Sequence, residues 1–158
     1  MKRKNLVKAH LFATAIAVLT ISTFSISSLA AELIGQESII RMVKTGILYA
    51  LPLLVFSMIA LTVTGNKLAG GSRHPELIQK QRRMKFITTN GMILVTLAIF
   101  LYYQATYQSI NAVFLSAQIA ELALGFTNLV LIGMNIKAGL RLSARKQKGN
   151  LQPTSLTQ

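Results

Sequence analysis

Three long stretches of the sequence carry no charged residue, and they constrain the fold more than any other feature. Leu11 to Ala31 is uncharged over 21 residues, Thr45 to Asn66 over 22, and Phe86 to Ala120 over 35. A helix that crosses a bilayer needs about 20 mostly apolar residues. The first two stretches each match one crossing. The third is too long for one, and its middle, residues 102–111, is rich in tyrosine and polar residues, which is typical of a membrane–water interface.

Dividing the third stretch at this turn predicts an all-α fold, a transmembrane four-helix bundle. The expected spans are residues 11–31, 45–66, 86–105 and 112–136. They form one domain, residues 11–141, with a basic tail before it (1–10) and a flexible tail after it (142–158). A hydrophobic content of 52% excludes intrinsic disorder. The lack of cysteine excludes disulfide frameworks and thiolate metal sites.

The positions of the lysines and arginines predict how the bundle is oriented. Of these 17 residues, 15 fall in the N-terminal tail, the second connection and the C-terminal tail. Four crossings put these three segments on one side of the membrane. Because short cytoplasmic segments carry the excess of lysine and arginine, we expect both termini in the cytoplasm.

The first span has a second interpretation, as a cleavable signal peptide. The basic start, the apolar run and Ser28-Leu29-Ala30 before Ala31 fit such a peptide. Its apolar region usually covers 7–15 residues, and this one is longer, so we favour an uncleaved helix. Cleavage would leave three spans with the same orientation.

The second connection carries a cluster of cations that we expect to face lipid. Pro75 is well placed to begin a short interfacial helix leading into the third span. Four cations of this helix would turn toward anionic lipid headgroups: Lys80, Arg82, Arg83 and Lys85. A topology determinant explains this cluster better than a dedicated lipid or partner site. No region is large enough for a nucleic-acid-binding domain, so we expect no nucleic acid partner.

Polar residues on the fourth span recur at helical spacing. Six polar or small residues are separated by 3, 4 or 7 positions and therefore lie on one stripe of the helix: Gln118, Glu121, Gly125, Asn128, Asn135 and Gly139. Small and amide residues let helices approach closely and hydrogen-bond inside a membrane. The stripe would hold the four helices of the bundle together, or it would form the contact with a second copy of the chain or with another membrane protein. Asn90 and Gln104, on one face of the third span, are plausible partners for it.

Glu121 is the acidic residue that lies within a predicted span. It is about 13 Å inside the outer end of its helix, where an ionised carboxylate is costly and is a functional candidate by default. A structural role, with the carboxyl reached by Gln118 or by Lys44 at the start of the second span, is equally open. No second intramembrane acid or buried cation forms a relay with it, which disfavours a proton pump.

The remaining residue types offer little for catalysis. Four glutamates and no aspartate cannot form an acidic metal cluster, and no Walker loop or Ser/His/Asp grouping is present. We therefore predict no catalytic residues, no metal and no cofactor. A haem held by two histidines needs both on facing spans, but of His10 and His74 the second lies in a connection.

Several segments resemble a family of small bacterial integral membrane proteins without an assigned activity. They extend from Arg41 to Arg141, about two thirds of the chain, and comprise Arg41–Gly46, Lys80–Met84, Asn90-Gly91, Glu121-Leu122 and Gly133–Arg141. The resemblance implies a multi-pass protein of the bacterial plasma (inner) membrane.

Three functions follow as expectations. The first is a non-enzymatic accessory or scaffold subunit in the membrane. The alternative is a small proton- or solute-coupled transporter or channel subunit that uses Glu121. A haem- or quinone-linked redox subunit is the weakest of the three.

Overall fold

Four long helices make up the computed structural model, which describes residues 3–70 and 75–151. They are α1 (Arg3–Ile34), α2 (Glu37–Ala69), α3 (Pro75–Tyr107) and α4 (Ala112–Leu151). Each contains a segment long and apolar enough to cross a membrane. The prediction of an all-helical chain with four helices of spanning length is confirmed.

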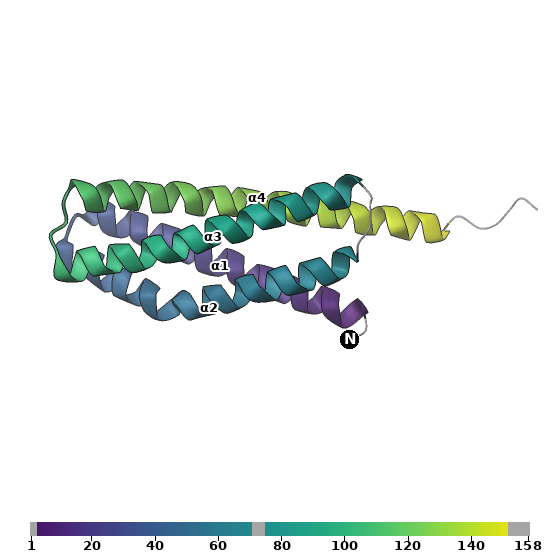
Figure 1. Ribbon diagram of the computed structural model, residues 1–158, viewed down its shortest axis with the longest axis horizontal. Helices are drawn as coiled ribbons and strands as arrows, with labels where there is room; N and C mark the ends of the chain where they lie inside the picture. The colour runs from purple at the N-terminus through teal and green to yellow at the C-terminus, as the bar shows by residue number, and fades with distance from the viewer. Residues whose placement is uncertain (1–2, 71–74, 152–158) are drawn as a thin grey trace, which may run out of the picture.

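The helices form an elongated bundle in which each packs against two neighbours. In the described residues α1 contacts α2 and α4, and α3 contacts the same two helices. The backbones of α2 and α4 therefore lie diagonally across the bundle. The α1–α2 and α3–α4 connections lie together at one end (Figure 1). The start of α1, the end of α2 and the start of α3 lie toward the other.

The residues that face the bundle interior follow a seven-residue repeat. On α4, steps of four and three residues alternate through Phe114, Gln118, Glu121, Gly125, Asn128, Ile132 and Asn135. On α3 the same steps connect Ile87, Gly91, Leu94, Ala98, Leu101 and Ala105. A mean spacing of 3.5 residues keeps one face of each helix toward its neighbours over many turns, as in left-handed helix bundles.

Large apolar side chains cover much of the outer surface, and several polar residues are buried inside. Polar residues are buried on α1, α2 and α4, while large apolar side chains point outward on all four helices. Among the most exposed are Phe12, Leu19, Leu33, Tyr49 and Phe56. Helices that pack inside lipid show this arrangement, with small and polar residues between helices and bulky apolar residues outside.

Helix α1 is part of this core. Ile21 belongs to an apolar cluster with Leu54 of α2 and Ile132 of α4, and Ala31 belongs to a second cluster with Phe114. A mature chain that begins near Ala31 would lose the first of these contacts. The uncleaved first span nevertheless stays a prediction.

Each helix extends beyond the span that was predicted within it. The third predicted span ends at residue 105, whereas α3 continues to Tyr107, so the connection to α4 consists of residues 108–111. Tyr103 and Tyr107, one helical turn apart, pack with ring centroids 5.4 Å apart and support the last turn of α3. Asn111 then caps α4, because its Oδ1 accepts hydrogen bonds from the amides of Val113 at 3.0 Å and Phe114 at 3.2 Å.

The C-terminal tail that the sequence predicts from residue 142 is helical over part of its length. Residues 142–151 continue α4, and residues 152–158 lie outside the described part. Leucine, alanine, arginine, lysine and glutamine dominate residues 142–148, and these residue types all favour helix.

Gly125 and Gly133 of α4 provide a matched test of the interior face. A Cβ at Gly125 would lie 3.0 Å from Ser25 Oγ of α1, whereas one at Gly133 would meet nothing within 4 Å. Gly125→Leu should therefore destabilise the bundle by about 1–3 kcal/mol through overpacking. Gly133→Leu should be neutral or stabilising, by up to about 1 kcal/mol.

Thermal unfolding of the purified variants in one detergent measures both effects. Equal melting temperatures for the two variants would contradict the assigned interior face of α4.

Candidate functional site

A buried ion pair joins α2 and α4, which lie diagonally across the bundle. Lys44 Nζ of α2 lies 2.6 Å from Glu121 Oε2 of α4. The Lys44 side chain is 1% exposed and that of Glu121 is 12% exposed. Since α2 and α4 are not neighbours, the contact depends on the length of both side chains.

Two further side chains hydrogen-bond to this pair. Lys44 Nζ donates to Ser28 Oγ of α1 at 3.0 Å, and Gln118 Nε2 donates to Glu121 Oε2 at 3.2 Å. Charge-assisted hydrogen bonds of this kind are stronger than neutral ones. Helices α1, α2 and α4 are therefore held together at one point. We call Ser28, Lys44, Gln118 and Glu121 the polar centre.

Glu32, one turn of α1 beyond Ser28, adds a second acidic group near the polar centre. It interacts electrostatically with Lys44 and with Glu121, although its distance from Lys44 exceeds that of an ion pair. Its Oε1 is buried without a hydrogen-bond partner. Glu32 therefore lies near the polar centre without taking part in its hydrogen bonds.

Apolar layers separate the polar centre from both ends of the bundle. On α2, Lys44 lies between Ile40 and Ile47 on one face, and all three are buried. Ile40 packs with Leu101 and Phe114 toward the end that holds the α1–α2 and α3–α4 connections. Ile47 packs with Leu51 and Ala98 on the other side. Low polarity around two opposite charges strengthens their attraction.

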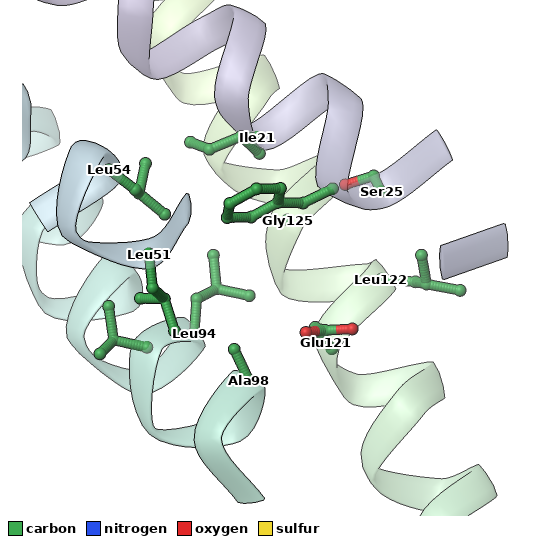
Figure 2. A pocket seen from close by; sticks show the side chains of 11 residues that line it. Ile21, Ser25, Leu51, Leu54, Leu94, Ala98, Glu121, Leu122 and Gly125 are labelled. Carbon is green, nitrogen blue, oxygen red and sulfur yellow. The ribbon is translucent and has the colours of Figure 1, made fainter. Parts of the chain in front are cut away.

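The space beside Glu121 is small and mostly apolar. A cavity of about 30 Å³ lies next to it, lined by residues of all four helices. Figure 2 shows Leu51 and Leu54 of α2, Leu94 and Ala98 of α3, and Ile21 and Ser25 of α1 around this space, with the Glu121 carboxylate at its edge. Such a cavity has room for a few water molecules and not for an organic substrate.

The other amides of the predicted stripe are buried, but they do not pair with one another. Asn128 is 1% exposed and Asn135 is 8% exposed. Their Oδ1 atoms have no hydrogen-bond partner, and neither does Gln118 Oε1. Asn90 donates to the backbone oxygen of Leu124 at 2.9 Å, which joins α3 to α4.

The other predicted partner, Gln104, contacts none of these amides, and its Oε1 is also buried and unpartnered. The structure therefore brings Lys44 and Gln118 to Glu121, but it does not form the expected amide–amide contacts.

The four cations of the predicted basic surface do not all face outward. Arg82 and Lys85 are exposed and Arg83 is half-buried. Lys80 differs from the prediction, because its Nζ lies 3.3 Å from where a Cβ on Gly139 of α4 would be. The reason is that α3 runs straight from Pro75 into the bundle (Figure 1). An interfacial segment would turn Lys80 outward, whereas this helix turns it inward with Met84 and Ile87.

His10 takes part in the packing of the bundle. His10 Nδ1 of α1 lies 2.8 Å from Thr64 Oγ1 of α2, an interhelical hydrogen bond, and His74 lies outside the described residues. No group of three metal-ligating side chains occurs within residues 3–70 and 75–151.

Sequence reasoning missed Ser28 and Glu32 as parts of the site. The sequence drew attention to Ser28 only as part of a possible signal-peptide cleavage motif. Glu32 was assigned to the connection between the first two predicted spans. Their four-residue separation, on one face of a helix that continues to Ile34, is the signal that would have linked them.

Comparison with known proteins gives no relative from which a role could be transferred. No protein-family model, curated protein or solved structure matches the chain. The resemblance to the small bacterial membrane proteins stays a prediction.

The polar centre predicts a strong energetic coupling between Lys44 and Glu121. Lys44→Met leaves a buried carboxylate and Glu121→Gln leaves a buried ammonium, so each should cost about 3–5 kcal/mol. Lys44→Met combined with Glu121→Gln should cost much less than the sum, because neither charge is then left alone. Unfolding free energies of the four proteins in one detergent measure the coupling.

The second ion pair of α2 serves as the control. Arg41 and Glu37 lie 3.5 Å apart with about half of each side chain exposed, so Glu37→Gln should change stability by less than about 1 kcal/mol. Additive costs of Lys44→Met and Glu121→Gln would show that the buried pair contributes no coupling.

Proposed function

We propose that the chain is a non-enzymatic, multi-pass integral membrane protein that acts as an accessory or scaffold subunit. The observation that carries this proposal is the Lys44–Glu121 ion pair at 2.6 Å. It gives the acid of the fourth span a structural partner, and it ties together helices that would otherwise touch only their neighbours.

The surroundings of Glu121 support a structural role over transport. One carboxylate oxygen accepts from both Lys44 and Gln118. The adjoining cavity is about 30 Å³, and apolar side chains fill the layers on either side. A substrate pathway would need polar groups or space leading from Glu121 to both ends of the bundle.

The apolar exterior and the basic end support the placement in a bacterial inner membrane. Four helices are of spanning length, their outward side chains are large and apolar, and 15 of the 17 cations belong to three segments that four crossings place on one side. With both termini in the cytoplasm, this distribution satisfies the positive-inside rule.

Single-cysteine labelling tests the orientation, and the lack of native cysteine means that each variant has one thiol. Gln36→Cys and Ser109→Cys, at exposed positions in the α1–α2 and α3–α4 connections, should react with a membrane-impermeant maleimide in intact cells. Asn5→Cys should react only after the membrane is permeabilised.

The reverse pattern would overturn the orientation. Labelling of residues 36 and 109 from opposite sides would overturn the four crossings. A mature protein that has lost residue 5 would identify the first span as a cleaved peptide.

Reconstitution in liposomes tests the structural role of Glu121 against the transport alternative. Vesicles containing the full chain should show the same proton flux down a pH gradient as protein-free vesicles, measured with a trapped pH-sensitive dye. The double variant Lys44→Met with Glu121→Gln should behave in the same way. A flux that needs the protein and disappears in the double variant would favour a transporter.

Co-purification from the native membrane in mild detergent tests the accessory role directly. We expect another membrane protein at fixed stoichiometry with both the wild type and the double variant. Elution of this chain alone or as a homo-oligomer would contradict that role.

A further inference from the structure

A second, much larger cavity lies at the opposite end of the bundle from the polar centre. It has a volume of about 310 Å³, is partly open, and is lined by residues of all four helices. The contributing segments are the start of α1, the end of α2, the start of α3 and the region around Asn135 of α4. Figure 1 shows the α1–α2 pair diverging from the α3–α4 pair toward this end.

The walls of this cavity change character along its length. Ile87 and Ile132, which belong to the central apolar cluster, line its inner part, together with Met58. Arg3 and Lys80 line it nearer the end of the bundle. A molecule that fills it therefore needs an apolar part and a polar part.

The polar lining favours an anion. Arg3, His10, Lys80 and Gln81 all line the cavity, and no acidic side chain is among the described residues that do so. The Lys80 ammonium lies over Gly139, where the lack of a side chain gives it room. Lysine and arginine side chains at this level attract acidic lipid headgroups.

Asn135 supplies a second, independent requirement. It lies one helical turn from Gly139 on the same face of α4, is more than nine-tenths buried, and lines the cavity. Its Oδ1 has no hydrogen-bond partner. A buried acceptor of this kind is costly unless a donor reaches it, and a hydroxyl group on the headgroup of a bound lipid would provide one.

We propose that this cavity binds one acidic phospholipid whose headgroup carries hydroxyls, such as phosphatidylglycerol. The phosphate lies at Lys80 and Arg3, a headgroup hydroxyl donates to Asn135 Oδ1, and the start of an acyl chain lies against Met58, Ile87 and Ile132. The site rests on the membrane placement in the proposed function, but it does not depend on the scaffold role or on the polar centre.

Native mass spectrometry of the full chain tests this site. The protein, in detergent, is mixed with equal amounts of phosphatidylglycerol and phosphatidylcholine that carry the same acyl chains. The first lipid bound should be predominantly phosphatidylglycerol. Lys80→Gln should lower that preference about fivefold, the effect of removing one cation near an anionic headgroup. Asn135→Leu should also lower it, because the acceptor is lost at nearly constant side-chain size.

Lys85→Gln is the matched control, since Lys85 lies on the same helix but is exposed and does not line the cavity. It should leave the preference unchanged. Leu61→Trp keeps every charge but fills the cavity, to which Leu61 contributes, and it should abolish the first bound lipid. Circular dichroism of each variant separates loss of binding from loss of folding.

Three results would overturn the proposal. One is an equal loss of preference in Lys80→Gln and Lys85→Gln, which would place the lipid on the outer surface. Another is unchanged binding in folded Leu61→Trp and folded Lys80→Gln. The third is displacement of phosphatidylglycerol by an equal concentration of inorganic phosphate, which would make the ligand a free anion. Failure of the proposed function would instead appear in the labelling and flux experiments, which do not involve the cavity.

Discussion

The ion pair between Lys44 and Glu121 crosses the bundle between two helices whose backbones do not touch. Every other side-chain hydrogen bond between helices in the described residues joins neighbours, as His10 does with Thr64 and Asn90 with the backbone of Leu124. A bond across the diagonal restrains the bundle in a direction that neighbour contacts leave free. It also requires that the residues around it be small or well packed, because two long side chains occupy the centre.

The two ends of the bundle are built differently. At the end with the α1–α2 and α3–α4 connections, Leu101, Ala105 and Phe114 are completely buried, and the helices close tightly around an apolar cluster. At the other end the helix pairs diverge around a cavity of about 310 Å³. The polar centre lies on the closed side, where water has little access, and the cations gather at the open end. The closely packed end of the bundle and the end with the accessible cavity are therefore opposite ends of the same four helices.

Much of this arrangement follows from the periodicity of the sequence. Uncharged runs of spanning length identify the helices, and the 3- and 4-residue intervals on the fourth span identify its interior face, including Gln118 and Asn128. Lys44 was one of two side chains expected to reach Glu121, and in the structure both do. These inferences depend on one helix at a time, and local spacing is enough for them.

The parts that sequence reasoning missed depend on how helices are placed relative to one another. Ser28 is one of several serines on α1, and which serine faces Lys44 depends on the rotation of α1 against α2. The position of Lys80 depends on α3 entering the bundle without a bend. Asn128 and Asn135 were expected to hydrogen-bond to other helices because they lie on the interior face of α4. The spacing of residues along one helix does not give their distance to polar groups on the next helix.

The seven-residue repeat on α4 has a consequence for how this helix finds its position along the bundle. Glu121, Asn128 and Asn135 occupy equivalent places in successive repeats, so a slide of α4 by seven residues, about 10.5 Å, would keep the same face of the helix toward its neighbours. Asn128 would then stand opposite Lys44, and the ammonium would be buried against a neutral amide. Since α4 contains a single acidic residue, one register alone neutralises Lys44, and the carboxylate distinguishes it from registers that present the same face of α4.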